Sequence, residues 1–474
     1  MTAPMRTETF HENARAALAD EPLRIALRRA TSLFADKRSG AIATVSDWEG
    51  LRERAQTIKT ETLAHLDHYL VLFAENASRA GAQVHWARDA GEACEVIATI
   101  AERRGARSVV KSKSMATEEI HLNAALARRG VDVVETDLGE YIIQLAGETP
   151  SHIVAPAIHK TKEQVSALFA KALGTPETDD IAALTAAARV ALRRRFAEAD
   201  LGISGVNFAV AETGSILVIE NEGNARLTTT LPRTHIALMG IEKVVPLLAD
   251  LDVFLQLLPR SGTGQRLTAY QSLLTGAKRD ATHEGPDELH VVIMDNGRSR
   301  MLAHPMTRQA LACIRCGACL NVCPVYQQIG GHAYGSVYAG PIGAVITPQL
   351  FGMERAAQLP YASSLCGACR DACPVKIDIP ALLLHLRSEV TRSATLGSPR
   401  ERLAFRLYAA VMRRPWAFEW AGRLARTVQR LTGIGTTRHP EAPVLGAWTA
   451  WRDLRPIAPQ SFRELWRSAL RQRS

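Results

Sequence analysis

Seven of the eight cysteines in this 474-residue chain lie between residues 313 and 373, in two runs. The first run is Cys313-x2-Cys316-x2-Cys319-x3-Cys323-Pro324, and the second is Cys366-x2-Cys369-x3-Cys373-Pro374. Clustered cysteines in a chain of this length more often bind metal than pair with each other. Three thiolates from a C-x2-C-x2-C loop can wrap one face of an iron–sulfur cubane, with the fourth coming from elsewhere. The runs therefore predict two [4Fe–4S] clusters and a function in electron transfer.

In two-cluster ferredoxins the cysteine before proline in each run ligates the other cluster. Gly317 and Gly367 would let the backbone bend close to inorganic sulfide, where amide groups can hydrogen-bond to it. Applied here, the pattern assigns the seven cysteines to cluster 1 (Cys313, Cys316, Cys319 and Cys373) and to cluster 2 (Cys323, Cys366 and Cys369).

Zinc is the main alternative metal, but structural zinc sites usually take two spaced pairs of ligands rather than three cysteines in seven residues. Superposing the runs places Ser363 where Cys313 stands, so cluster 2 has three cysteine ligands. A partner, water or small ligand could complete the site, the Ser363 oxygen could do so, or the cluster could be a three-iron or labile form. An open iron could also act as a Lewis acid on a substrate, so the alternative hypothesis is that the protein is an enzyme.

Residues 81–298 are predicted to form an α/β domain, because short apolar runs alternate with helical patterns. Gly214 marks a tight hairpin, which predicts a mixed sheet with a mostly parallel core. Residues 1–80 are expected to be helical, with Ser46 capping a helix and Glu49 reaching back to its amide. The predicted strands are 82–87, 107–112, 131–136, 152–157, 205–212, 215–220, 234–240 and 288–294.

Residues 299–390 carry the cysteine runs, and residues 391–474 form a basic, tryptophan-containing extension that is helical to about 432 and irregular at 432–448. The extension contains sixteen arginines and five acidic residues, although the whole chain has a net charge of only +9. Such a tail suits nucleic acid, an anionic membrane surface or an acidic protein. Because no helix-turn-helix and no basic patch interleaved with aromatics is present, we do not expect nucleic-acid binding.

The first twenty residues lack an apolar signal-peptide core, and no apolar run approaches the roughly 18 residues that a membrane span needs. We therefore expect a cytoplasmic protein. The basic extension leaves peripheral association with the inner face of the membrane as an option.

The sequence resembles the lactate utilization protein B family of bacterial iron–sulfur proteins over nearly its full length. The likeness lies in GVNFAVAETGSILVIENEGNARLTTTLPRTHIALMGIEKVVP at 205–246, in SKSMATEEIHLN at 112–123, and in CIRCGACLNVCPVY with SLCGACRDACPVKIDIP. The seven-cysteine count is a trait of that family. The resemblance implies a LUD domain at 81–298, similar in fold to CoA transferases and ribose-phosphate isomerases, followed by a mostly α-helical dicluster module and a helical extension.

What the family implies is participation in the oxidation of L-lactate to pyruvate. Two companion proteins would take part, a cysteine-rich redox subunit and a second LUD protein. This chain would be a non-catalytic subunit that passes electrons toward a respiratory acceptor. Another 2-hydroxy acid or glycerol phosphate is the alternative substrate.

Polar residues on or near the hairpin are candidates for a ligand site in the LUD domain: Glu212, Asn221, Glu222 and Asn224. Lys111 and Lys113 end a strand before a helix, a place suited to anions. We expect His121, His152 and His235 to be structural, and Cys94 to be a small buried hydrophobe. No glycine-rich nucleotide-binding loop is present.

Overall fold

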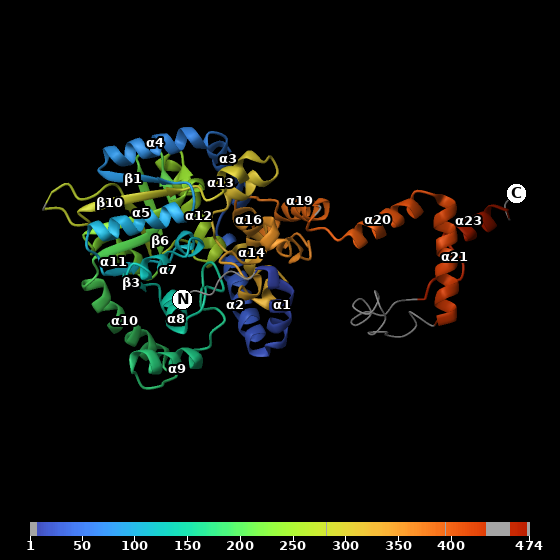
Figure 1. Cartoon of the computed structure of the whole chain (residues 1–474), viewed down its shortest axis with the longest axis horizontal. Helices are drawn as coiled ribbons and strands as arrows, with labels where there is room; N and C mark the ends of the chain where they lie inside the picture. Colours follow the sequence, from blue (N-terminus) through green and yellow to red (C-terminus); the bar gives the residue numbers. More distant parts are fainter. Residues whose placement is uncertain (1–6, 281, 394, 433–455, 472–474) are drawn as a thin grey trace. The chain divides into compact units, whose positions relative to one another are not determined.

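The computed structural model describes residues 7–280, 282–393, 395–432 and 456–471. They belong to two compact units, Met1–Val390 and Thr391–Ser474, which are described separately (Figure 1). Among the helices in these ranges, none is both long and apolar enough to cross a bilayer.

A parallel six-stranded sheet forms the centre of the first unit. Its order is β1-β10-β7-β4-β2-β3, and every pair of neighbours is parallel. All seven residues of β7 are buried, as expected for a strand covered on both faces. The strands are β1 (Ala82–Ala87), β2 (Ser108–Lys111), β3 (Asp132–Glu135), β4 (Leu201–Gly205), β7 (Thr234–Gly240) and β10 (Glu288–Met294). The α/β prediction is confirmed, but residues 152–157 form bends and turns, so the strand predicted there is wrong.

The hairpin at Gly214 belongs to a second sheet, of order β8-β5-β6-β9. Gly214 has φ +69°, and a Cβ there would lie 2.1 Å from the backbone nitrogen of Ala77. The predicted hairpin is confirmed, since β5 and β6 pair antiparallel. The main sheet is nevertheless entirely parallel, because β5 pairs on its other side with β8 of the second sheet. The strands are β5 (Phe208–Val210), β6 (Ser215–Glu220), β8 (Val244–Val245) and β9 (Tyr270–Leu274).

Helices cover both faces of the parallel sheet. Ile236 and Leu238 of β7 belong to one apolar core, whereas Ala237 and Met239 belong to another, as the alternation of a strand requires. The helices of this region are α5 (Ala90–Arg103), α6 (Met115–Glu119), α7 (Leu122–Ala127), α8 (Leu138–Ala146), α9 (Lys162–Leu173), α10 (Ile181–Ala197), α11 (Asn224–Thr230) and α12 (Leu251–Gly262), with 3-10 turns η2 (Ile241–Lys243) and η3 (Leu248–Asp250).

The first 79 residues are helical where they are described, as predicted, and they pack against the cysteine-bearing region as well as the sheet. The expected cap at Ser46 is wrong. The Asp47 carboxylate caps the helix by accepting from the Gly50 amide at 2.8 Å, while Glu49 binds Arg52. The elements are η1 (Thr7–Thr9), α1 (Phe10–Ala19), α2 (Glu21–Ile42), α3 (Trp48–Ala64) and α4 (Leu66–Arg79).

The cysteine-bearing region is built from short helices around a long buried one, α16, of which ten residues are buried. This region shares one apolar core with the helices before β1 and with one face of the sheet. Its elements are α13 (Arg298–Ala303), η4 (Thr307–Ala312), α14 (Ala318–Asn321), α15 (Tyr326–Ile329), η5 (His332–Tyr334), α16 (Gly340–Phe351), α17 (Met353–Ala356), η6 (Leu359–Tyr361), α18 (Ala368–Ala372) and α19 (Ile379–Arg392).

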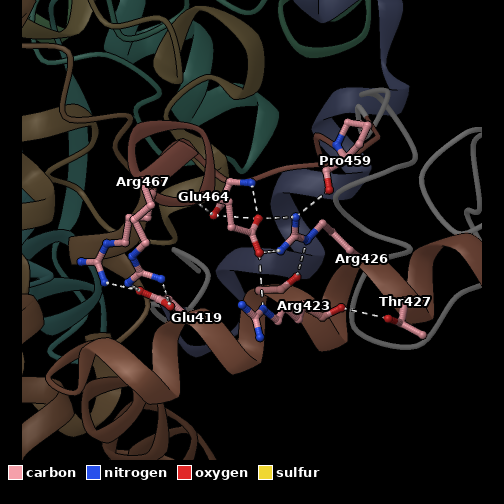
Figure 2. Close-up of polar contacts among 10 residues, drawn as sticks. Glu419, Arg423, Arg426, Thr427, Pro459, Glu464 and Arg467 are labelled. Atoms are coloured by element: carbon pink, nitrogen blue, oxygen red, sulfur yellow. Dashed lines mark hydrogen bonds and ion pairs between the residues drawn. The ribbon is translucent and has the colours of Figure 1, made fainter. Parts of the chain in front are cut away.

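The second unit contains α20 (Pro399–Met412), α21 (Pro415–Thr432) and α23 (Phe462–Arg471). Figure 2 shows how two carboxylates join α21 to α23. Glu464 accepts from Arg426 at 2.9 Å, and Glu419 accepts from Arg467 at 2.6 Å. The helical prediction to about residue 432 is confirmed. The segment predicted to be irregular lies, beyond Thr432, outside the described residues.

Candidate metal centre and adjoining cavity

Four cysteines from both runs line one small cavity: Cys313, Cys316, Cys319 and Cys373. Cys373 follows Cys313 by sixty residues in the sequence. The two runs meet because α18 and the turn after it pack beside α14. The structure therefore brings together the four residues that the sequence assigns to cluster 1.

Backbone amides point at the sulfur atoms of this group. The Arg315 amide donates to Cys313 Sγ at 3.4 Å, and the Ile377 amide donates to Cys373 Sγ at 3.4 Å. Arg315 has φ +61° and Gly317 has φ +76°, and these left-handed residues wind the loop around its own thiols. Amide-to-sulfur hydrogen bonds of this kind stabilise thiolate ligands.

Burial disfavours the thiolate form of Cys316 and of Cys373 when no cation is near. It raises the pKa of Cys316 to about 12 and that of Cys373 to about 11. Buried thiols become thiolates when a metal ion compensates their charge. A closed set of four sulfur donors suits an iron–sulfur cluster or zinc, and the three-in-seven spacing favours the former. The residues thus fit the predicted group.

Arginines from the N-terminal helices hold the backbone at Cys373 in place. Arg52 of α3 donates from Nε and Nη2 to the Cys373 carbonyl oxygen at 3.0 and 2.8 Å. Arg38 of α2 donates to the Ala372 carbonyl oxygen at 3.1 Å. Helices α2 and α3 therefore support the backbone that carries Cys373.

The remaining cysteines of the two runs, Cys323, Cys366 and Cys369, form a second group. Burial, and then the neighbouring Cys323 thiol, raise the pKa of Cys369 to about 12. Cys366 is exposed, and the Ala368 amide lowers its pKa. Cys94 lies apart, half-buried against the sheet's helices, with its thiol donating to the Ile120 carbonyl oxygen. The second group matches the three residues that the sequence assigns to cluster 2.

A cavity of about 390 Å³ lies at the carboxyl ends of β2, β4 and β7. Ligands commonly bind at this edge of parallel sheets. Three of the four residues predicted for a ligand site line it: Asn221, Glu222 and Asn224. Glu212 does not line it, because its carboxylate accepts from the Leu248 amide at 2.8 Å on another side of the hairpin.

The far wall of this cavity belongs to the cysteine-bearing region, with Arg315, Cys316 and Tyr338. Burial, and then the charge of Asp137, raise the pKa of Glu222 to about 7. Burial lowers the pKa of Lys243, another lining residue, to about 8. The cavity thus joins titratable groups of the α/β region to the first cysteine loop.

The two lysines predicted to suit an anion have different surroundings. Lys111 is fully buried and lies 2.6 Å from Glu118 and 2.7 Å from Glu135, so its charge is used inside the protein and the anion prediction for it is wrong. Lys113 lines the cavity and donates to the Val154 carbonyl oxygen.

Two of the three histidines expected to be structural, His152 and His235, have buried side-chain partners. His152 bonds Asn321 at 3.1 Å and accepts from the Val154 amide, and His235 bonds Ser204 at 2.7 Å. Burial lowers the pKa of both to about 3, so they stay neutral. His121 takes a left-handed φ of +52° before α7.

Sequence reasoning missed a buried ionic network beside the cavity. Arg298 donates to Glu119 at 2.9 and 2.7 Å and to Glu242 at 2.6 Å. The Tyr338 hydroxyl donates to Glu119 at 2.6 Å, and the Arg315 side chain lies 3.5 Å from Glu242. Arg315, Glu119 and Glu242 lie in separate sequence segments, and no spacing among them signals contact, so only their meeting in three dimensions reveals the network.

Three family descriptions match consecutive parts of the chain. The LUD domain matches residues 70–294, the 4Fe-4S dicluster domain matches 309–377, and "Lactate utilisation protein B, C-terminal" matches 386–470.

Curated relatives named Lactate utilization protein B match nearly the whole chain. The protein from Bacillus pumilus (strain SAFR-032) is 42% identical and covers 98% of each chain. The protein from Shouchella clausii (strain KSM-K16) is 45% identical and covers 96% of each. The protein from Bacillus subtilis (strain 168) is 45% identical over 86% of this chain and 85% of that one.

Among solved structures, a DUF162 family protein from Deinococcus radiodurans is 16% identical, covers 48% of this chain and 98% of its own, and has a TM-score of 0.28. A likeness this weak carries no argument.

Proposed function

The chain belongs to the Lactate utilization protein B family, and from this premise we propose that it is the electron-transferring subunit of a complex that oxidises L-lactate to pyruvate. Membership supports a role in lactate utilization and iron–sulfur electron transfer. The observation that carries the proposal is the gathering of the seven cysteines into one group of four, three of them buried, and a second group of three.

Two [4Fe–4S] clusters are the proposed cofactors, with Cys313, Cys316, Cys319 and Cys373 holding one, and Cys323, Cys366 and Cys369 holding the other. When bound, they supply one-electron redox chemistry. The protein binds them through thiolates, surrounds the first with apolar side chains, and donates amide hydrogen bonds to the sulfur atoms. Arg38 and Arg52 keep the turn that carries Cys373 in register.

Lactate oxidation releases two electrons, whereas iron–sulfur clusters accept one at a time. We therefore place lactate chemistry on companion proteins, a cysteine-rich redox subunit and a second LUD protein, and the final electrons on a respiratory acceptor. The proposed location is the cytoplasm, with the arginine-rich extension available for the inner face of the membrane. A chain acting alone would then not turn over lactate.

The cavity at the sheet edge is the proposed ligand site of the LUD domain, with Asn221, Glu222 and Asn224 as its polar contacts. It reaches Cys316 of the first cysteine group. Its lining includes no member of the second group. The enzyme alternative, in which the three-cysteine cluster acts on a substrate in this cavity, therefore lacks a geometric basis among the described residues.

Anaerobic purification with iron and sulfide quantitation tests the cofactor assignment. We expect about eight irons per chain, with Cys373→Ala damaging one cluster and Cys323→Ala damaging the other. Cys94→Ala is the matched control and should leave the iron content unchanged. Iron near zero with stoichiometric zinc would refute the proposal.

Growth tests address the substrate. A deletion strain should fail on L-lactate and recover with the intact gene. Failure on glycerol phosphate or another 2-hydroxy acid, with normal growth on L-lactate, would instead select the alternative substrate.

A further inference from the structure

The loop at residues 363–367, which contains Cys366, has the same backbone conformation as the loop at residues 313–317, which begins the first cysteine run. The third residue of each loop, Arg315 and Leu365, has a left-handed φ of +61° and +56°, although neither is glycine. The fifth, Gly317 and Gly367, has φ +76° and +88° and begins a short helix. Non-glycine residues rarely adopt this conformation, so its repetition at equal spacing marks one loop design used twice.

Side-chain hydrogen bonding repeats as well. The Arg315 amide donates to Cys313 Sγ at 3.4 Å, and the Leu365 amide donates to Ser363 Oγ at 3.1 Å. Relative to its own loop, the Ser363 oxygen therefore occupies the position that a ligand sulfur occupies in the first loop.

Neighbouring groups fix the backbone of Ser363. Arg387 of α19 donates to the Ser363 carbonyl oxygen at 2.9 Å and to the Pro360 carbonyl oxygen at 2.8 Å. Its guanidinium also lies over the Tyr361 ring, 5.1 Å from the centroid. Ser363 is half-buried, whereas Ser364 beside it is exposed.

We propose that Ser363 Oγ is the fourth ligand of the second cluster, alongside Cys323, Cys366 and Cys369. This inference rests on the proposed function, since it needs a cluster at the second group. Binding forms an iron–oxygen bond and breaks the serine O–H bond, and the proton leaves to solvent, as protons do when other ligands bind metal. A filled fourth position leaves no open iron for substrate, which suits electron transfer.

Oxygen is a harder donor than sulfur and favours the more oxidised iron. A serine-bound cluster should therefore have a lower reduction potential than its all-cysteine counterpart, and Ser363→Cys should raise that potential.

Mössbauer spectroscopy of the full-length protein, loaded anaerobically with the iron-57 isotope, tests the ligand directly. The wild type should show one iron in eight with the larger isomer shift of an oxygen-bound site. Ser363→Cys should keep the iron content and lose that component. Ser363→Ala should lose one iron at least tenfold faster under mild oxidation and give the EPR signal of a three-iron cluster.

Ser364→Ala is the matched control. Its hydroxyl hydrogen-bonds the Cys366 thiol but is not the proposed ligand, so Ser364→Ala should shift the reduction potential at most and should keep the oxygen-bound component. Eight irons with identical spectra for wild type and Ser363→Ala would overturn the serine ligand alone. About four irons in the wild type, all at the first group, would overturn the two-cluster premise as well.

Discussion

At the residue scale, a group of acidic side chains beneath the sheet edge has too little positive charge around it. Lys111 neutralises Glu118 and Glu135 in part, while Glu140 lies buried beside them with one carboxylate oxygen lacking a hydrogen-bond partner. Burial, and then the charges of Glu135 and Glu118, raise the pKa of Glu140 well above its ordinary value of 4.5. Glu140 therefore keeps its proton to a higher pH in the folded protein than in the unfolded chain.

This protonation makes stability depend on pH. Above pH 4.5 the folded state keeps a proton that the unfolded state releases, so the free energy of unfolding falls as pH rises toward the folded-state pKa, by up to about 1.4 kcal/mol per unit. Glu140→Gln should flatten this slope above pH 4.5, as measured by anaerobic thermal unfolding. The exposed Glu177→Gln is the control. A variant with the wild-type slope would contradict the raised pKa of Glu140.

Residue types alone predicted part of the candidate site. Cysteine spacing assigns ligands because thiolate geometry is strict, and the structure groups the cysteines in the same way. The two carboxylates of the hairpin were harder to separate: Glu212 lies beside the turn at Gly214 and Glu222 follows the far end of β6, and only Glu222 lines the cavity. Strand direction separates them, and that is a property of tertiary structure.

At the element scale, α3 acts as a brace for the second cysteine run. Arg52 is 8% exposed and gives two hydrogen bonds to a single carbonyl oxygen, that of Cys373. A buried carbonyl left without partners costs about 1–3 kcal/mol. The brace therefore contributes stability at the point where the chain closes around the first cysteine group.

Arg52→Met should lower the free energy of unfolding by about 2–4 kcal/mol, since a buried charged donor and its acceptor lose each other. It should also speed iron release to a chelator at least several-fold. Arg54→Met, on the exposed face of the same helix, provides the comparison. Equal release rates for the two variants would show that α3 does not brace the ligand.

The local apolar pattern of the sequence predicted which segments form helices and which form strands, but it did not predict what each element packs against. Apolar runs located the strands of the parallel sheet, whereas residues 152–157 have a similar apolar content and form turns. There the chain packs against the cysteine-bearing region, where the Ser151 carbonyl oxygen accepts from the Tyr326 hydroxyl at 2.7 Å. Tertiary contacts of this kind override the local preference.

At the scale of the whole molecule, one buried arginine joins the α/β region to the cysteine-bearing region. Arg298 is 1% exposed, and it binds Glu119 of the α/β region. Glu119 also accepts a hydrogen bond from Tyr338, which belongs to the cysteine-bearing region and follows the first cysteine run in the sequence. The large apolar core is likewise continuous across the two regions. We infer that residues up to Val390 unfold as one cooperative unit.

Arg298→Met should therefore destabilise the whole first unit by about 3–5 kcal/mol, because it strands two buried carboxylates. Circular dichroism and cluster absorbance should be lost together in one transition at a lower temperature. Arg300→Met, exposed two residues away, should leave the transition in place. Separate transitions for the sheet and the chromophore would show that the regions unfold independently.

The grouping of Cys373 with three cysteines that precede it in the chain also has a consequence for translation of the protein. At about 5–20 residues per second, a ribosome needs roughly 3–12 s to translate the sixty residues between Cys313 and Cys373. During that interval three thiols of the set leave the ribosome before the fourth exists. If these four thiols hold one cluster, as proposed, their donor set is complete only after residue 373 has been translated, and unfinished chains expose three thiols to zinc and oxidants in the meantime.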